Sequence, residues 1–371
     1  MRNEVRGLGL EVGKARHPHL KPPTSGAAVG DFSEGDLIAR IQQQLPPPPD
    51  WLLVGIGDDA AVVEPERNRV EVLTVDALVE GVHFDRAFVP PEAIGHRALA
   101  VNLSDLAAMG AAPRLALLSF ALPAALPLAD FEGMIAGLAR LAAGHRIHVA
   151  GGNLTRSPGP LMIDITVAGS VKRRQALTRA GARPGDEIYV SGTIGAAAAG
   201  LGMLREMSST IKDTKDASSV LNVLKNDCIE RYLYPEPRVR LGLLLSRNRA
   251  ASASIDLSDG LADGVHRIAD ASGVGAVIDA DALPIDPGVR AWFEDRGLDP
   301  VAEALTAGDD YELLVTVRPQ TRRRMAAAKR GGVPLTRIGT CTEGRAALLR
   351  VRSGSAVTEG ELPAGGYDHF R

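Results

Sequence analysis

Short apolar runs alternate with helical segments along most of this chain, and no other sequence feature restricts its fold as much. Six apolar runs have the length and composition of buried strands, at residues 70–75, 115–122, 161–167, 187–190, 274–278 and 313–317. Helical spacing predicts helices between them, over 91–109, over 130–143 with Gly144 as the closing residue, and from Asp259 to the residue before Gly273. This alternation predicts a mixed α/β (α+β) architecture.

The chain length of 371 residues predicts about two domains. Residues 1–30 contain proline and glycine without periodicity, and we expect them to form a flexible leader. The stretch 179–185 contains glycine and proline and is the best candidate for a junction. It gives an N-terminal domain at 31–178 and a C-terminal domain at 179–371. A polar stretch at 205–227 is expected to be an exposed insertion in the second domain.

Charge and composition exclude several classes of function. With 42 Lys and Arg against 45 Asp and Glu, the net charge is −3, which provides no broad basic surface for nucleic acid. The longest apolar stretch, 115–129, is short and interrupted by prolines, so we expect no membrane span. Cys228 and Cys341 lie far apart in the sequence, which indicates neither a zinc site nor a disulfide framework. A cytoplasmic protein is therefore expected.

Aspartates recur near the ends of the predicted strands and helices, beside glycine or serine. The residues concerned are Asp58, Asp59, Asp76, Asp105, Asp256 and Asp259. Bare phosphate would be repelled there, but Mg²⁺ is typically held by one or two carboxylates together with substrate phosphates and water. The sequence contains no P-loop and no Gly-x-Ser-x-Gly motif. The aspartate pattern therefore favours magnesium-assisted chemistry on phosphates.

These segments also have purely structural interpretations. The Gly-Asp-Asp segment at 57–59 is compatible with a simple turn. Asp105 lies in an apolar helical segment, where a salt bridge to Arg97 or Arg114 would satisfy its charge. The Ser-Asp pair at 258–259 is compatible with an N-cap for the following helix. On the sequence alone, the metal-binding and the structural interpretations both stay open.

Two further segments contain candidate ligand-binding residues. Gly151, Gly152 and Asn153 follow an apolar run and are compatible with a turn that cradles a nucleotide with backbone N–H groups. A lone Gly-Gly turn is nevertheless weak evidence for such a site. His83 follows Asp76 closely, which makes it the most interesting histidine, although a lone histidine is more often structural.

Taken in order, the motifs resemble those of the thiamine-monophosphate kinase family, in the aminoimidazole ribonucleotide synthetase-like superfamily. The matching segments are GIGDDA at 55–60, DALVEGVHF at 76–84, VNLSDLAAMGA at 101–111, ALTR at 176–179, IDLSDGL at 255–261, GDDYEL at 308–313 and GYDHF at 366–370. The resemblance implies a two-domain fold whose N-terminal domain forms a homodimer through its sheet, with the active site between the domains. It also implies transfer of the γ-phosphoryl group of ATP to thiamine monophosphate.

The resemblance further implies roles for individual residues. Several Mg²⁺ ions would lie at Asp59, Thr74, Val75, Asp76, Asp105, Asn153, Asp256 and Asp259. ATP would contact Gly152, Asn153, Arg179 and Ser258. Thiamine monophosphate would face His83, Asp309 and Tyr367, although Tyr367 is also compatible with simple packing of the C-terminus. Asp76, Asp105 and Arg179 are expected to act most directly on the transferred phosphoryl group.

Four positions depart from the family's pattern. Asn153 replaces an Asp, Val75 a Thr, Ala196 an Asp and Asp309 a Glu. Because Asn153 keeps an oxygen ligand but removes one negative charge, weaker Mg²⁺ binding and slower turnover are expected. Two alternatives therefore stay open: a degenerate binder of nucleotides or thiamine phosphates with little turnover, and a related ATP-dependent enzyme with another acceptor.

Overall fold

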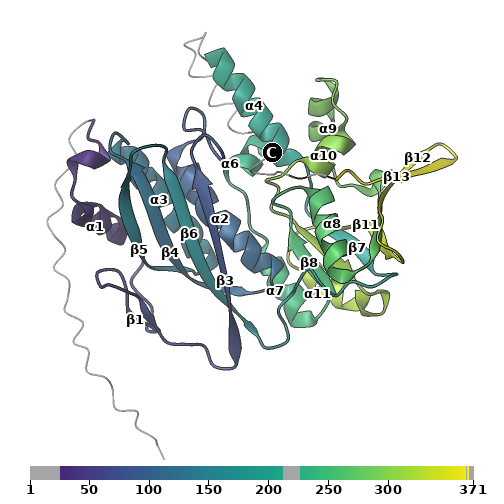
Figure 1. Ribbon diagram of the computed structural model, residues 1–371, viewed down its shortest axis with the longest axis horizontal. Coiled ribbons are helices and arrows are strands. Elements are labelled where there is room, and N and C mark those ends of the chain that lie inside the picture. Colours follow the sequence, from purple (N-terminus) through teal and green to yellow (C-terminus); the bar gives the residue numbers. More distant parts are fainter. Residues whose placement is uncertain (1–25, 212–225, 365, 367–371) are drawn as a thin grey trace, which may run out of the picture.

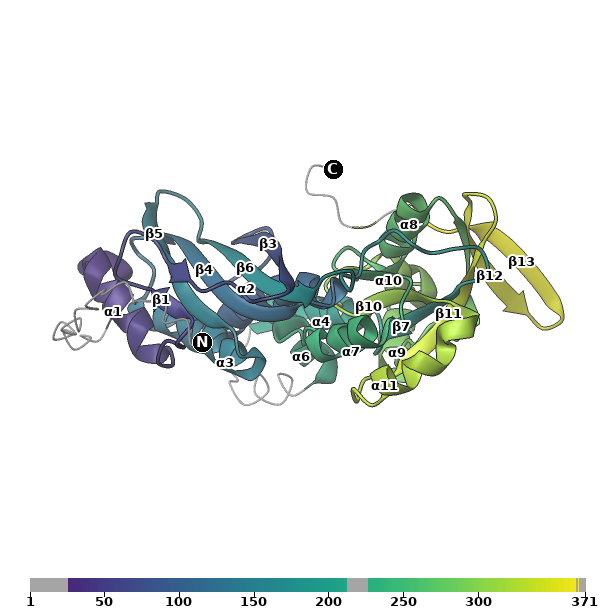
Figure 2. The same cartoon turned by 90° about the horizontal axis from the view of Figure 1, so that it is seen from below.

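The computed structural model describes residues 26–211, 226–364 and 366, which form two neighbouring halves, each built on its own sheet (Figures 1 and 2). The N-terminal half contains η1 (Val29–Asp31), α1 (Glu34–Gln44), β1 (Leu52–Val54), β2 (Val62–Val63), β3 (Arg69–Val79), α2 (Pro91–Ala108), β4 (Ala112–Pro123), α3 (Leu128–His145), β5 (His148–Ser157) and β6 (Met162–Lys172). The helices and mixed sheets confirm the expected α/β (α+β) class.

The C-terminal half has more and shorter elements. They are β7 (Glu187–Ser191), α4 (Ala196–Ile211), α6 (Asp227–Leu233), α7 (Val239–Asn248), β8 (Ala253–Asp256), α8 (Leu261–Ser272), β9 (Gly275–Asp279), η2 (Ala280–Ala282), α9 (Pro287–Glu294), α10 (Pro300–Thr306), β10 (Leu313–Val317), η3 (Pro319–Arg324), α11 (Met325–Lys329), β11 (Leu335–Thr342), β12 (Ala347–Ser353) and β13 (Ala356–Glu361). Its seven-stranded sheet has the order β13-β12-β9-β11-β7-β10-β8. The β12–β13 hairpin projects from the body of the molecule (Figure 2).

The N-terminal sheet has the order β3-β6-β4-β5, and only the β4–β5 pair within it is parallel. Alternate residues of its strands, such as Leu118 and Phe120, are buried against α2 and α3, which lie behind the sheet in Figure 1. Glycines bring these two helices close together, since a Cβ atom on Gly95 would lie only 1.8 Å from the Met134 carbonyl oxygen.

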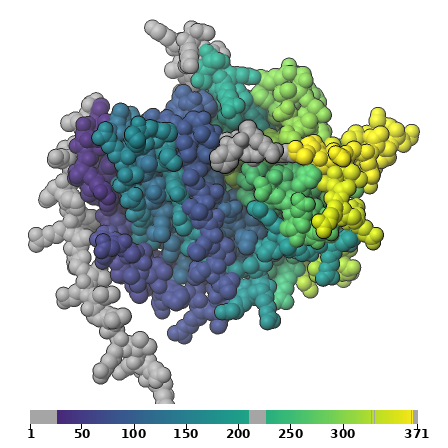
Figure 3. All heavy atoms as spheres, viewed as in Figure 1, coloured from purple at the N-terminus to yellow at the C-terminus, as the bar shows by residue number. Residues whose placement is uncertain are grey.

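The opposite face of this sheet is uncovered in the described chain and forms the broad blue and teal surface in Figure 3. Strand register places Val75, Thr166 and Leu117 side by side across β3, β6 and β4. Leu73 and Val75 are 70% and 58% exposed on this face. Large apolar side chains are usually buried in folded proteins. Their exposure here gives this face the character of an interaction surface.

Several element boundaries differ from those expected. Strand β3 continues to Val79, so Asp76 lies within the strand and not after it. Gly152 and Asn153 lie within β5, where the pairing with β4 contains an irregularity, and not in a turn. Helix α3 is closed by Arg146 in the left-handed conformation (φ 56°), and not by Gly144 as predicted.

The predicted leader and insertion fall largely outside the described residues. Of the leader, residues 1–25 are outside, whereas 28–30 belong to the fold through a bridge to Pro127 and through η1. Of the insertion, 212–225 are outside, whereas 205–211 belong to α4.

The two halves share a hydrophobic core. One cluster of buried side chains extends from the N-terminal sheet into α4, α6, α7 and β10. Where α7 crosses α2, a Cβ atom on Gly242 would lie 2.0 Å from the Ala107 carbonyl oxygen.

The division between residues 178 and 179 stays a prediction. In the described parts of the chain, no helix combines the length and apolar character needed to cross a membrane.

Candidate active site

A cavity of about 910 Å³ lies between the two halves. Its wall is formed by β3 and the loop after it, by α2, α4 and α6, by the end of β8 with the loop after it, and by the loop 307–311. It brings together eight of the predicted site residues: Val75, Asp76, His83, Asp105, Asp256, Ser258, Asp259 and Asp309. Segments that are far apart in the sequence therefore converge on one site.

Strand alternation and helix placement bring Asp76 and Asp105 into contact. Thr74 and Asp76 share the face of β3 that packs on α2, and the Thr74 hydroxyl donates a hydrogen bond to Asp105 on that helix. The carboxyl groups of Asp76 and Asp105 also lie close enough to influence each other's pKa. Burial, followed by the charge of Asp105, raises the pKa of Asp76 to about 7. Burial likewise raises the pKa of Asp105, against the opposing effects of Thr74 and of the Arg179 charge.

Asp256 is a third carboxylate of this cluster. It ends β8, is buried, and accepts a hydrogen bond of 2.8 Å from the Ser104 hydroxyl. Burial, followed by the charge of Asp105, raises its pKa to about 7. Ser104 was not among the predicted site residues, although its place beside Asp105 in the VNLSDLAAMGA segment is the signal that identifies it.

Two of the structural alternatives are wrong, the salt bridge of Asp105 and the N-cap at 258–259, whereas a turn at 57–59 agrees with the structure. Arg97 pairs with Asp309 and Arg114 with Glu71, so neither arginine satisfies Asp105. The N-cap of α8 is Gly260, which makes no side-chain capping bond. Asp259 instead lies 3.6 Å from the Arg267 guanidinium.

A second cavity, of about 430 Å³, lies beside β5 and α1. Asp59, Gly152 and Asn153 line it, and it shares no lining residue with the larger cavity. Gly152 is required by close packing, because a Cβ atom there would lie 2.0 Å from the Leu118 carbonyl oxygen. Within a single chain, these three residues therefore do not come together with the carboxylate cluster.

Two residues predicted to face thiamine monophosphate lie in the larger cavity. The backbone N–H of Val79 donates to Nδ1 of His83 over 3.0 Å, which fixes the ring beside the end of β3. Asp309 has a left-handed backbone (φ 68°), and its Oδ1 accepts a hydrogen bond of 2.9 Å from the Tyr311 hydroxyl. Tyr367 lies outside the described residues.

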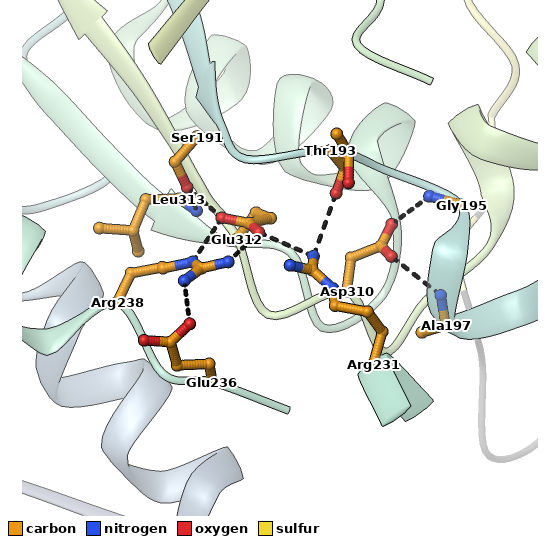
Figure 4. Close-up of polar contacts among 10 residues, drawn as sticks. All are labelled: Ser191, Thr193, Gly195, Ala197, Arg231, Glu236, Arg238, Asp310, Glu312 and Leu313. Atoms are coloured by element: carbon orange, nitrogen blue, oxygen red, sulfur yellow. Dashed lines mark hydrogen bonds and ion pairs between the residues drawn. The ribbon is translucent and has the colours of Figure 1, made fainter. Parts of the chain in front are cut away.

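A buried ion-pair network supports the loop that carries Asp309 (Figure 4). Glu312 is fully buried and accepts hydrogen bonds from Nε and Nη2 of Arg238 at 2.8 and 2.6 Å, from Arg231 at 2.7 Å, and from Ser191. Asp310 accepts a hydrogen bond of 2.7 Å from the Gly195 N–H beside the start of α4. The sequence did not identify this network, because Glu312 directly precedes an apolar strand and its arginines are more than 70 residues away.

Replacing Glu312 is expected to destabilise the fold strongly. Glu312→Gln leaves Arg231 and Arg238 without their buried counter-charge, so the free energy of unfolding should fall by about 3 kcal/mol. Burial opposes ionisation, but the hydrogen bonds from Arg238 outweigh it and lower the pKa of Glu312 below its ordinary 4.5. The stabilising contribution of Glu312 is therefore present above that pH and is lost as the pH falls, so the variant should also lose part of its acid sensitivity.

Denaturant unfolding between pH 3 and pH 8, a range of about five units around the ordinary carboxyl pKa, measures both effects. The exposed Glu294→Gln at the end of α9 is the matched control and should change the unfolding free energy by less than about 0.5 kcal/mol. Equal unfolding curves for Glu312→Gln and wild type would contradict the supporting role of the network.

The donor set of the larger cavity fits a hard divalent cation. Asp76, Asp105 and Asp256 supply carboxylate oxygens, and burial raises the pKa of each, an effect that a bound cation would offset. Among the described residues, no three His, Cys, Asp or Glu side chains converge closely enough to hold a metal by themselves. Mg²⁺ does not require such convergence, since it retains waters and takes up substrate phosphate oxygens.

Comparisons with known proteins agree with this geometry. Two family models match: AIR synthase related protein, N-terminal domain, at residues 57–171, and its C-terminal domain at residues 183–351. Thiamine-monophosphate kinase of Escherichia coli K12 is 38% identical over 92% of this chain and 99% of its own length.

Two solved structures have the same architecture. The crystal structure of thiamine-monophosphate kinase from Stenotrophomonas maltophilia K279a is 38% identical with a TM-score of 0.72, covering 87% of this chain and 97% of that one. AaThiL complexed with AMPPCP and TMP is 31% identical with a TM-score of 0.68, covering 94% and 100%. With its two matching domains and these full-length relatives, the chain belongs to the thiamine-monophosphate kinase family of AIR synthase related proteins.

Proposed function

We propose that this protein transfers the γ-phosphoryl group of ATP to thiamine monophosphate, forming thiamine diphosphate and ADP. The observation that carries the proposal is the convergence of Asp76, Asp105 and Asp256 on a cavity of about 910 Å³ that also contains His83 and Asp309. The AaThiL relative complexed with AMPPCP and TMP supports the same pair of substrates.

Two free thiols, at Cys228 and Cys341, suit the reducing cytoplasm, where we place the reaction.

The main difficulty of this reaction is to bring two polyanions together in line. In our proposal Asp76, Asp105, Asp256 and Asp259 hold several Mg²⁺ ions, with Thr74 and Val75 beside them. Mg²⁺ held by these carboxylates would supply charge neutralisation for the transferred phosphoryl group. Arg179 is exposed, and its charge already acts on Asp105, so we assign it to the transferred phosphoryl group and the nucleotide, together with Ser258.

The acceptor needs no general base. The phosphate of thiamine monophosphate has a second pKa of about 6 and is largely ionised at neutral pH. One of its oxygens forms the new bond to the γ-phosphorus as the bond to the β-phosphate oxygen breaks. His83 and Asp309, which line the same cavity, serve to orient the acceptor.

We further propose that two protomers associate through the uncovered face of the N-terminal sheet. The row of exposed apolar side chains on β3, β6 and β4 supports this association. The dimer would also explain why Asp59, Gly152 and Asn153 line a separate cavity in one protomer. In our proposal these three residues complete the nucleotide and metal site of the partner.

The substitution Asn153→Asp is expected to reduce the Mg²⁺ requirement. It restores one negative charge beside the nucleotide, so the Mg²⁺ concentration for half-maximal activity should fall about three- to tenfold, the range of a modest electrostatic gain. A Mg²⁺ titration of the initial rate at fixed ATP measures this. The control is Asn68→Asp, which adds the same charge at an exposed position before β3 and should leave the titration unchanged. Identical titrations for wild type and Asn153→Asp would count against this role of Asn153.

The direct test of the function is a product assay with purified protein, thiamine monophosphate, ATP and excess Mg²⁺, in which thiamine diphosphate is followed by chromatography. Formation of thiamine diphosphate over many turnovers supports the proposal. Calorimetric binding of both substrates without product would instead support the degenerate binder, for which the neutral Asn153 is the specific evidence.

A further inference from the structure

We infer that Arg97 is the positioning residue for the carboxylate of Asp309, and that this pair sets the affinity for the thiamine end of the acceptor. The inference rests on the proposed function. Arg97 comes from α2 in the N-terminal half, whereas Asp309 follows α10 in the C-terminal half. Both line the larger cavity, so their contact closes one wall of the site between the halves.

The head group of Arg97 has a single well-defined position. The side chain is only 1% exposed. One Nη atom donates to the Tyr232 carbonyl oxygen, and the guanidinium lies 4.4 Å from the centre of the Tyr232 ring. The other Nη atom lies 3.2 Å from Oδ1 of Asp309. A planar guanidinium held by a carbonyl, a ring face and a carboxylate has little freedom left, and an ammonium group cannot reproduce these contacts together.

Asp309 is held in a conformation that side chains rarely adopt. Asp309 and Tyr311 both have left-handed backbones, with φ of 68° and 50°, which is costly for residues other than glycine. The Asp309 N–H donates to the Ser258 carbonyl oxygen at 2.8 Å, and the Tyr311 hydroxyl donates to Oδ1 of Asp309 at 2.9 Å. The residues on either side of Tyr311, Asp310 and Glu312, are anchored in the buried network of Figure 4.

This arrangement leaves the carboxylate rigid but accessible. The Asp309 side chain is 34% exposed although its Arg97 partner is buried. Both described partners, Arg97 and Tyr311, contact the same oxygen, Oδ1. The carboxylate is therefore oriented through one oxygen from within the protein, while its exposed part faces the cavity in which the acceptor would bind.

Side-chain length explains why this pair is matched. The contact of 3.2 Å between the Arg97 guanidinium and Oδ1 of Asp309 depends on the reach of both side chains. The shorter side chain in Arg97→Lys should move the Asp309 carboxylate out of place. The longer side chain in Asp309→Glu should crowd the Arg97 guanidinium. Exchanging both lengths, in Arg97→Lys combined with Asp309→Glu, keeps the total reach and the charges.

The experiment compares the KM values for thiamine monophosphate and for ATP in Arg97→Lys, Asp309→Glu and the double variant. Each single variant should raise the KM for thiamine monophosphate about tenfold, with the KM for ATP changed less than about twofold, because only acceptor binding loses its oriented carboxylate. The double variant restores the ion pair but not the contacts of the guanidinium with Tyr232, so it should recover the KM for thiamine monophosphate only in part, to about threefold above wild type. Tyr311→Phe removes only the hydroxyl bond to Oδ1 and should give a smaller increase, which provides a test if Arg97→Lys does not fold.

Arg114→Lys is the matched control. Arg114 is also buried, lies 4.5 Å over the Trp51 ring and pairs with Glu71, but lines neither cavity. Its replacement should leave both KM values unchanged. Parallel increases of both KM values in Arg97→Lys, or no recovery in a folded double variant, would overturn the positioning role.

A different result would contradict the proposed function without testing Arg97: the wild-type protein yields no thiamine diphosphate. In that case calorimetric binding of thiamine monophosphate still tests Arg97. Weaker binding by Arg97→Lys than by wild type and Arg114→Lys supports the inference, and equal binding overturns it.

Discussion

Asp105→Asn should reduce thiamine diphosphate formation by at least about a thousandfold and at the same time stabilise the metal-free protein. The loss of rate follows because a carboxylate in contact with bound Mg²⁺ contributes several kcal/mol to charge neutralisation in the transition state. The gain in stability follows from crowding, since the charge of Asp105 raises the pKa values of both Asp76 and Asp256. An Asn at this position can still accept from Thr74 and can donate its amide to Asp76.

The expected gain is about 1 kcal/mol in the free energy of unfolding, measured in the presence of a chelator. The control is Asp281→Asn at an exposed position in η2, which should change neither the rate nor the stability. Addition of Mg²⁺ should raise the melting temperature of wild type more than that of Asp105→Asn. A variant that is as active as wild type would remove Asp105 from the metal site. A variant that is less stable than wild type without Mg²⁺ would show that the hydrogen bonds of Asp105 outweigh the repulsion between the carboxylates.

The sequence predicts the carboxylate cluster because its members lie in segments with strong local patterns. Alternation along β3 determines that Thr74 and Asp76 share a face, whichever residue ends the strand. The apolar run around Asp105 requires that helix to be buried, and so requires a partner for its charge. What the local pattern cannot give is the placement of α2 on β3, which decides that the partner is Thr74 and Asp76 and not an arginine.

Other parts of the site depend on contacts between distant segments and were missed or misplaced. Glu312 resembles the polar edge of a strand, and only the fold brings Arg231 and Arg238 to it from α6 and from the start of α7. The sequence predicts Arg97 as a partner for Asp105, eight residues along the same helix, whereas Arg97 pairs with Asp309 in the other half. Long side chains in helices reach other elements more readily than local spacing indicates.

Leu73→Lys should convert the proposed dimer into monomers. Leu73 is 70% exposed on the uncovered face, in the edge strand β3, and a charge buried there in each protomer would cost several kcal/mol without a partner. Sedimentation velocity or light scattering measures the change in mass. Val357→Lys is the matched control: Val357 is 57% exposed on β13, in the projecting hairpin, and its replacement should leave the mass unchanged. A wild-type protein that is monomeric at assay concentrations would refute the dimer.

A mixing experiment then decides whether the second cavity acts in the partner's site. Asp59→Asn and Asp105→Asn should each be inactive alone, because Asp59 lines the smaller cavity and Asp105 the larger one. If the two residues serve the same site from different protomers, a heterodimer has one site with both substitutions and one with neither. Random mixing of equal amounts should then restore about a quarter of the wild-type rate, since half of the dimers are heterodimers with one intact site. If both residues act within one protomer, every site in the mixture carries a substitution and no activity returns.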